Sequence, residues 1–338
     1  MARRAVTRSR RSPSPSSSAA QPLHSAVAIV AGATRGAGRG IARGLGESGA
    51  TVYCTGRSVR GTPSPYKRPE TIEETAELVT AAGGLGIAVR VDHTVEEEVR
   101  ALVARVARER KGRLDVLVCS VAGEDPSVPW QQPLPKVDIA LGLRMFQQSV
   151  LSHLCTAKHA APLMIKRRQG LIVEVTEGDT LSGGVSLLHH LVKSALKQLA
   201  FTMADELRKH KVTVLSITPG FLRSESMLEH FKVTEANWRD GGKKDPNFLC
   251  SETPLFVGRA VAALAADPDK ATRSGQVTSS WELARHYGFT DVDGSRPDWG
   301  AHFPTIMDGY GWLKEGLLRE AAWLDQLSER AKRYAGPC

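Results

Sequence analysis

The sequence predicts a doubly wound α/β fold, in which a parallel sheet is covered by helices on both faces. Short apolar runs that resemble fully buried strands alternate along the chain with amphipathic stretches of helical period. The first apolar run, 27–31, continues directly into the glycine-rich segment 32–38 and then into a helix-forming stretch at 39–45. A strand, a glycine turn and a helix in this order are typical of a sheet that receives a phosphate-bearing ligand at its edge.

The remaining elements follow in alternation. Strands are expected at 51–55, 86–91, 114–119, 171–176, 212–218 and 276–279, and helices at 71–82, 95–111, 138–168, 187–210 and 254–266. Gly83 and Gly84 end the second helix, and Thr94 with Glu97 predicts a capping box for the third. Right-handed crossovers between these parallel strands give a single three-layer, Rossmann-like domain.

The charge of the chain is concentrated at its beginning. The formal net charge is +9 over 338 residues, and five arginines lie within the first eleven residues. Residues 1–25 are rich in Arg, Ser, Pro and Ala and have no acidic residue, which predicts a disordered extension. The rest is mildly basic and carries no module that combines aromatic and basic residues, so no nucleic-acid partner is expected.

Neither a membrane nor a metal is expected. No apolar run reaches secretory or membrane-spanning length, and Pro13 and Pro15 disfavour the amphipathic helix of an organelle transit peptide. The five cysteines have neither metal-ligand spacing nor the density of a disulfide framework, which favours a reducing cytoplasm.

Three segments are expected along the chain. The extension 1–25 precedes a domain at 26–294, which includes a substrate lid at about 221–254. A C-terminal extension at 295–338 contains an amphipathic helix at 312–334. Its apolar stripe is expected to pack against the domain or a partner subunit, and comprises Leu313, Leu317, Ala321, Leu324, Leu327 and Ala331.

Functional residues are expected where the parallel strands end, because ligands of such sheets bind outside the carboxyl ends of the strands. The segments at those ends are 32–38, 56–58, Asp92, 120–123, 176–177 and 219–220. Within the first of them, the glycines permit a tight turn, a close approach of backbone to a pyrophosphate and close packing of helix on strand.

Several of these residues together resemble the short-chain dehydrogenase/reductase family. The resemblance covers about 25–290 and rests on the spacing of Gly32, Gly36 and Gly38, on Asp92, on 121–123, on Lys193, and on Pro219 with Gly220. The stretch 281–294 is similar to the branch typified by dehydrogenase/reductase family member 1. The resemblance implies hydride transfer between a nicotinamide cofactor and a small alcohol or carbonyl, in a homodimer or homotetramer paired through the fifth and sixth helices.

Charge at the end of the second strand favours NADP(H) over NAD(H). A site for the unphosphorylated cofactor usually has an acidic residue there, whereas this chain has Arg57, which with Arg35 could clamp a 2′-phosphate. Both arginines could instead be solvated, and Asp92, which the resemblance places on the adenine amine, could instead cap a turn. The full set of expected cofactor-binding residues is Gly32, Thr34, Arg35, Gly36, Gly38, Arg57, Ser58, Asp92, Ala122, Gly123, Lys193, Pro219 and Gly220.

The catalytic positions depart from the family pattern. The resemblance implies a tyrosine four residues before Lys193, a serine thirteen residues before that tyrosine, and an asparagine further upstream; this chain has His189, Thr176 and Ser149 there. Histidine is a common general acid/base, and the nearby Lys193 ammonium favours the neutral imidazole, hence a base in alcohol oxidation. His189 could instead be non-catalytic. Glu177 is a candidate for a further carboxylate in the pocket or for an exposed rim residue.

Two insertions, 124–148 and 221–254, are expected to frame the substrate. Aromatic residues of the second suggest an apolar pocket, or else anchor a long loop to the core. The loop 59–69 lies beside the predicted 2′-phosphate site. Two other hypotheses remain open: a protein that binds the cofactor without redox turnover, and a lyase or dehalogenase on the same scaffold, which the intact phosphate loop disfavours.

Overall fold

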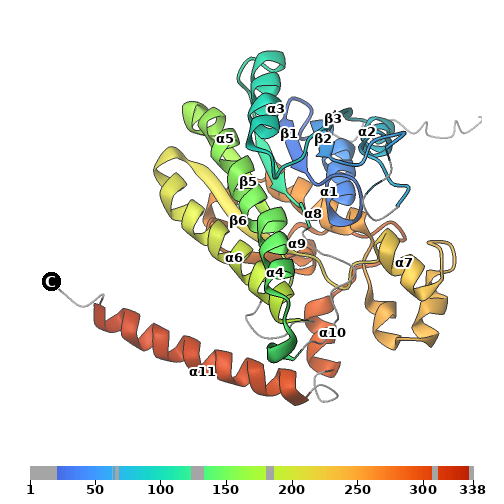
Figure 1. The fold of residues 1–338 in the computed structure, drawn as a ribbon, viewed down its shortest axis with the longest axis vertical. Coiled ribbons are helices and arrows are strands. Elements are labelled where there is room, and N and C mark those ends of the chain that lie inside the picture. Colours follow the sequence, from blue (N-terminus) through green and yellow to red (C-terminus); the bar gives the residue numbers. More distant parts are fainter. Residues whose placement is uncertain are drawn as a thin grey trace, which may run out of the picture.

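A parallel seven-stranded sheet organises the part of the chain that the computed structural model describes, namely 21–62, 64, 68–122, 133–179, 186–306 and 311–334 (Figure 1). The strands are β1 (Val27–Ala31), β2 (Thr51–Gly56), β3 (Leu85–Arg90), β4 (Val116–Cys119), β5 (Gly170–Val175), β6 (Val212–Thr218) and β7 (Val277–Ser279). Their order is β3-β2-β1-β4-β5-β6-β7. The chain therefore reverses direction across the sheet between β1 and β4, which confirms the doubly wound fold.

Helices cover both faces of this sheet. They are α1 (Gly36–Glu47), α2 (Ile72–Ala81), α3 (Glu96–Glu109), α4 (Ile139–Phe146), α5 (Ser152–Arg167), α6 (Leu187–Leu207), α7 (Glu225–Phe231), α8 (Pro254–Ala266), α9 (Ser280–Tyr287), α10 (Trp299–Ile306) and α11 (Gly311–Tyr334). A π-helical turn, η2 (Gln147–Leu151), joins α4 to α5 without a break. The predicted helical region 138–168 is thus one continuous path with a bulge inside it.

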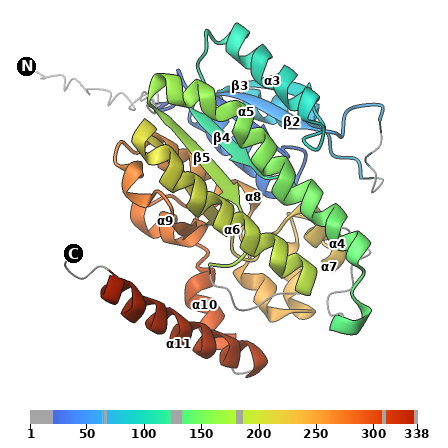
Figure 2. The same cartoon turned by 60° about the vertical axis from the view of Figure 1, so that its left-hand side comes forward.

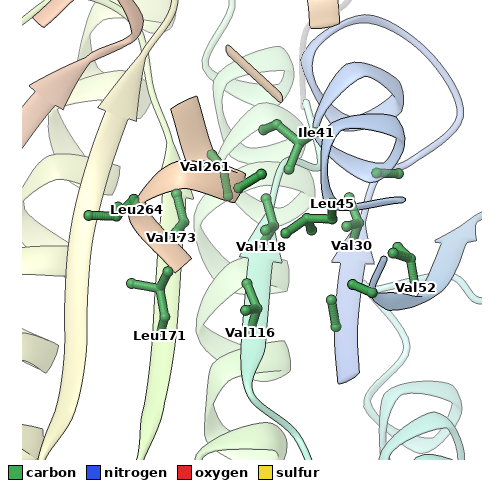
Figure 3. Packing of buried hydrophobic residues seen from close by; sticks show 14 of the residues in the cluster. Val30, Ile41, Leu45, Val52, Val116, Val118, Leu171, Val173, Val261 and Leu264 are labelled. Atoms are coloured by element: carbon green, nitrogen blue, oxygen red, sulfur yellow. The ribbon is translucent and has the colours of Figure 1, made fainter. Parts of the chain in front are cut away.

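The period of two along each strand divides the core into two layers. In β1, Ala28 and Val30 face α1, α2 and α8, whereas Val27 and Ile29 face α3, α5 and α6. Figure 3 shows the first layer, where Ile41 and Leu45 of α1 and Val261 and Leu264 of α8 pack over the sheet. All four helical side chains are fully buried. This packing fixes the start of α1 against the crevice between β1 and β4.

One predicted helix cap is wrong. The Thr94 hydroxyl donates to Oδ1 of Asp92 at 2.7 Å, and α3 begins after Val95, whose side chain makes no capping hydrogen bond. The capping box lies instead at α2, where Thr71 and Glu74 exchange side-chain and backbone hydrogen bonds. The Thr94 hydroxyl, which the sequence predicted as part of the helix cap, is therefore bound to Asp92 instead.

The chain continues beyond the sheet into two further helices (Figure 2). α10 contains Pro304 and was not expected. α11 matches the predicted amphipathic helix, but Leu324 and Leu327 of its apolar stripe are exposed rather than covered. None of the described helices combines the length and apolar character that crossing a bilayer requires.

Candidate cofactor and catalytic site

The glycine segment after β1 forms a tight cradle. The backbone amides of Gly32 and Ala33 both donate to the carbonyl of Thr55, at 3.0 and 2.9 Å, and Gly32 has φ +82°. A Cβ on Gly32 would lie 2.5 Å from the carbonyl oxygen of Ser120, and one on Gly38 would lie 2.1 Å from that of Gly32. Only glycine fits at these two positions, and the backbone therefore reaches the β1/β4 crevice without side chains in the way.

The N-terminus of α1 lies directly above this cradle. Arg35 is the N-cap residue but makes no side-chain capping bond, and the first turn has no acidic residue. Instead, the backbone amide of Gly36 donates to Oε2 of Glu225, the first residue of α7, at 2.8 Å. Arg39 lies 3.7 Å from the other oxygen of this carboxylate. Glu225, which is distant in the chain, thus supplies the anion that this helix terminus favours.

Arg35 points to an ion cluster at the edge of loop 59–69. Its Nε donates to Glu70 at 3.3 Å, and Arg68 binds the same carboxylate with two hydrogen bonds, at 3.1 and 2.8 Å. Burial of Glu70 opposes its ionisation, but these arginines outweigh that effect and lower its pKa. Among the described residues, Nη2 of Arg35 is shielded from solvent and has no hydrogen-bond partner. One donor of the predicted clamp is therefore still available for a phosphate oxygen.

Arg57 and Asp92 lie together at the ends of β2 and β3. Nη1 of Arg57 is 3.7 Å from Oδ2 of Asp92. The other carboxylate oxygen accepts the amide and hydroxyl of Thr94, so Asp92 does cap a turn. Burial of Asp92 opposes ionisation, but the Thr94 hydrogen bonds and the Arg57 charge lower its pKa. Ser58, beside Arg57, is buried, and its carbonyl accepts the amide of Ile72.

A buried layer supports the segment after β4. Nε2 of His153 donates to the carbonyl of Val121 at 3.1 Å, and Nδ1 lies 2.6 Å from Oε2 of Glu174. Both side chains are buried, and with Cys119 they could also hold a metal ion, although 2.6 Å is the length of a hydrogen bond. This layer fixes the backbone leading to Ala122, which is exposed; Gly123 lies outside the described residues.

The predicted acid/base residue has a partner at the end of β5. Nε2 of His189 lies 2.7 Å from Oε2 of Glu177. Burial of Glu177 opposes its ionisation, but the hydrogen bond with His189 and the charges of Lys193, His189 and His190 lower its pKa to about 2. Glu177 is thus an ionised carboxylate directly beside the imidazole, although its side chain is half exposed.

Thr176 is also close to Lys193, but through the backbone. Its hydroxyl, in a buried residue, donates to the carbonyl of Lys193 at 2.9 Å. This bond ties the end of β5 to the middle of α6. It also uses the only hydroxyl proton of Thr176, so in this geometry Thr176 can accept a hydrogen bond from a ligand but cannot donate one.

Ser149 lies inside the π-helical turn η2 and is buried. The neighbouring Ser152 donates to the carbonyls of Gln148 and Ser149, at 2.5 and 3.1 Å. π-Bulges are frequent at functional sites because they re-aim backbone and side-chain groups. The position that the sequence predicted for the upstream polar residue therefore coincides with the one irregular turn in the α4–α5 path.

The buried carboxyl of Glu252 holds the backbone at Pro219 and Gly220. Oε2 of Glu252 accepts the Gly220 amide at 2.9 Å and the Ser280 hydroxyl at 2.5 Å. Burial, together with the charge of Asp291, raises the pKa of Glu252 to about 8 despite these hydrogen bonds and the Arg223 charge. Trp299 of α10 also packs against Gly220, since a Cβ on Gly220 would lie 2.8 Å from Cβ of Trp299 and 3.0 Å from Oε2 of Glu252.

Aromatic residues of the segment 221–254, the predicted lid, form a small hydrophobic core of their own. Phe231 and Phe248 stack with ring centroids 4.1 Å apart, and Trp238 meets Phe248 edge-on. All three are buried. They anchor the segment 221–254, which was one of the two expectations, and an apolar pocket built from these three rings is not supported. Phe221 and Met227 are only partly buried.

Four residues that contact the candidate site were not singled out from the sequence: Glu70, Glu225, Glu252 and Trp299. Each meets the strand-end residues only through long-range contacts. Thr34, which is buried, was predicted, and its carbonyl accepts a hydrogen bond from Arg39.

Comparison with known proteins identifies the class that this fold and site define. A family model described as short chain dehydrogenase matches residues 26–232. The chain belongs to the short-chain dehydrogenase/reductase family, a family of nicotinamide-dependent oxidoreductases.

Individual relatives agree with this placement. The chain is 35% identical to dehydrogenase/reductase SDR family member 1 of Mus musculus over 321 residues, which covers 90% of this chain and 96% of the relative. Among solved structures, a hydroxysteroid dehydrogenase from Escherichia coli has a TM-score of 0.61 at 22% identity, covering 77% of this chain and 97% of the other. A metagenomic short-chain oxidoreductase in complex with NADP has a TM-score of 0.56 at 24% identity, covering 76% and 96%.

Proposed function

We propose that the protein is an NADP(H)-dependent oxidoreductase that interconverts a small alcohol and a carbonyl, with His189 in the acid/base role. The observation that carries this proposal is the pairing of His189 with the ionised Glu177, one helical turn before Lys193. A histidine held by a carboxylate is the arrangement that fixes an imidazole tautomer for proton transfer.

The residues present fit the cofactor. The Gly32 and Gly38 positions leave a cradle that a Cβ would fill, and one shielded nitrogen of Arg35 has no hydrogen-bond partner within the described part of the chain. Arg57 and Arg35 would hold a 2′-phosphate, while Gly36 and its neighbours would bind the pyrophosphate through backbone amides. Asp92, Ala122, Gly123, Lys193 and Pro219-Gly220 would hold the remainder. We therefore propose NADP(H) over NAD(H), and a metagenomic relative of the same fold was solved with NADP.

The chemistry assigns distinct tasks to the pocket residues. The nicotinamide, when bound, supplies the hydride acceptor or donor. When Nε2–H of neutral His189 donates to Glu177, Nδ1 is the ring atom that can take the proton of a substrate hydroxyl. Glu177 then stabilises the imidazolium that results. Lys193 contributes positive charge beside this pair, and Thr176 would polarise the substrate oxygen once its hydroxyl turns from the Lys193 carbonyl to donate to that oxygen.

A second function is favoured by one observation. Because the Thr176 hydroxyl donates to the Lys193 carbonyl, no proton from Thr176 is offered to a substrate carbonyl in this geometry. Binding of the cofactor without redox turnover is the alternative that fits this contact.

Assembly and location complete the proposal. We propose a homodimer or homotetramer paired through the α5–α6 face, because Leu187, Leu191 and Phe201 of α6 and Leu154 of α5 are large apolar residues exposed there. The domain spans 26–294 with its lid at 221–254, and the extension 295–338 carries α11. A reducing cytoplasm suits the buried free thiols of Cys54 and Cys119.

Binding and turnover are tested separately. NADPH and NADH are titrated into the protein by following nicotinamide fluorescence, and a panel of alcohols and carbonyls is then screened for a change in nicotinamide absorbance. Tight NADPH binding with turnover of any panel member supports the oxidoreductase. NADPH binding without turnover across the panel favours the alternative, and absence of binding by both cofactors contradicts the proposal.

A further inference from the structure

The carboxylate of Glu225 lies where a phosphate group would be expected. The hydrogen bond between the Gly36 amide and Glu225, at 2.8 Å, joins two residues that are 189 positions apart in the chain. The amides of the first helical turn lack intrahelical acceptors, and the helix dipole favours an anion beside them. Because the first turn of α1 has no acidic side chain and Arg35 does not cap it, Glu225 is the anion that meets this requirement.

This contact and a bound pyrophosphate exclude one another. The proposed function assigns the Gly36 amide to the pyrophosphate, and one N–H cannot point at two anions at full strength. Two anions placed at one helix terminus also repel each other, and Arg39, which lies 3.7 Å from Glu225, would be shared between them. Glu225 must therefore leave before the phosphates bind in the cradle.

The two ends of α7, the helix that carries Glu225, are held by different kinds of contact. Phe231, at the far end of α7, is buried in the aromatic cluster with Phe248, whereas Glu225 is only partly buried. Lys232, which follows Phe231 in the chain, has φ +58° and ends α7. α7 is thus anchored by packing at its C-terminal end and by polar contacts at its N-terminal end, which lies toward α1 (Figure 1). Polar contacts of this kind can open while the aromatic anchor stays in place.

A second ion pair ties α7 to the same edge of the site. Glu229 lies 2.6 Å from Arg68, and Arg68 also binds Glu70, which in turn binds Arg35. Since Glu229 is largely exposed, solvent screens its pair with Arg68, and its contribution is small. The specific contact with the cradle is therefore the one made by Glu225.

We propose that Glu225 acts as an internal competitor for the pyrophosphate and that α7 is a latch, which the cofactor phosphates open. Glu225 then sets the affinity for any dinucleotide, whatever its 2′ substituent, and favours release of the cofactor after each turnover. The latch rests on the proposed function in one respect, namely that the cradle receives a pyrophosphate.

The test compares Glu225→Gln and Glu225→Ala with Glu229→Gln, which removes one charge from the same helix without touching Gly36. Each protein is titrated with NADPH, NADH and inorganic pyrophosphate, and thermal unfolding confirms that it is folded. Removing the carboxylate should tighten all three ligands by about tenfold, because all three share the phosphates that compete with it. Glu229→Gln should change the affinities by less than about twofold.

The outcomes separate the latch from the proposed function. Tighter pyrophosphate binding in both Glu225 variants, with no preference for NADPH, supports the latch and contradicts the cofactor choice. Unchanged or weaker binding of pyrophosphate and both dinucleotides in the Glu225 variants overturns the latch, whichever cofactor the wild-type protein prefers. Equal tightening in Glu229→Gln also overturns it, because the effect would then be general charge and not the contact with Gly36.

Discussion

Nε2 of His189 and the carboxylate of Glu177 lie 2.7 Å apart, although one belongs to the first turn of α6 and the other follows β5. The carboxylate is ionised at every pH at which the protein would be assayed, because its pKa is lowered to about 2. The imidazole therefore faces a fixed negative charge. A catalytic position that departs from the family pattern is thus not isolated but belongs to a pair.

Replacing Glu177 tests whether this pair works as a unit. Glu177→Gln keeps the shape but removes the charge that orients the imidazole, and we expect kcat to fall by about tenfold with a smaller effect on KM. In the double variant with His189→Gln the two losses should not add, because one residue acts through the other. Asp179→Asn, an exposed carboxylate two residues further on, is the control and should leave kcat unchanged. Additive losses would contradict a shared role.

His189→Tyr restores the residue type that the family pattern implies. If His189 is a working acid/base, this variant should lose most of the existing activity, because a phenol is longer than an imidazole and holds its proton near neutral pH. Steady-state rates and cofactor titrations of both proteins make the comparison, and equal cofactor affinity shows that the fold is intact. Activity that appears only in the tyrosine variant would show that His189 does not serve as acid/base.

Cofactor choice should depend on Arg57. Arg57→Asp places a negative charge where the 2′-phosphate is expected, so the ratio of NADPH to NADH affinity should fall by at least about tenfold. Arg100→Asp is the control, since Arg100 lies on α3, is exposed and pairs with the exposed Glu97. Fluorescence titrations measure both ratios. A ratio that stays constant in Arg57→Asp would refute the clamp.

Local patterns were enough to predict the fold. Strands with nearly continuous apolar runs and helices with a clear period gave every strand of the described sheet to within about two residues. The short helices α7, α9 and α10 were missed because each has too few turns to show a period, and Pro304 lies inside α10. The predicted capping box at Thr94 was wrong for a different reason. The Thr94 hydroxyl donates to Asp92, an acceptor that the spacing of Thr94 and Glu97 does not reveal.

The site residues that follow strand ends were predictable from the fold, whereas Ser149, His189 and Lys193, which lie in helical segments, were predicted only through the family resemblance. Gly32, Arg57, Asp92 and Thr176 could be placed because parallel strands bring their carboxyl ends together. The contacts of Glu225 with Gly36 and of Glu252 with Gly220 could not, because they depend on how the segment 221–254 folds back onto α1 and the end of β6. The hydrogen bond from the Thr176 hydroxyl to the Lys193 carbonyl depends on the side-chain rotamer of Thr176, which could not be predicted from the sequence.

Self-association should depend on the exposed apolar residues of α6. Leu191 of α6 is half exposed, so Leu191→Glu would bury a charge in the proposed α5–α6 interface and shift the protein toward monomer. Sedimentation velocity across a concentration series measures this shift. Leu249→Glu is the control, because Leu249 is about as exposed as Leu191 and lies within 221–254, outside α5 and α6. A wild-type protein that is monomeric at all concentrations would contradict the proposed pairing.

Glu252 should make stability depend on pH. Its pKa is raised from 4.5 to about 8 by burial and by the charge of Asp291, so the folded state holds a proton that the unfolded state releases above pH 4.5. Below that pH both states are protonated and Glu252 contributes nothing; between about 4.5 and 8, its contribution lowers the free energy of unfolding by at most about 1.4 kcal/mol per pH unit. Above pH 8 both states are ionised and the loss stops growing.

Glu252→Gln removes this titration and keeps an oxygen that can accept the Gly220 and Ser280 hydrogen bonds. Urea unfolding at a series of pH values should show the variant gaining stability relative to wild type as the pH rises through the window. Glu235→Gln is the control, because Glu235 pairs with the same Arg223 but is about half exposed. The quantity compared is the difference in the free energy of unfolding between wild type and Glu252→Gln at each pH, because other groups titrate in both proteins. Curves that run parallel from pH 4.5 to 8 would show that Glu252 is not held protonated under Gly220.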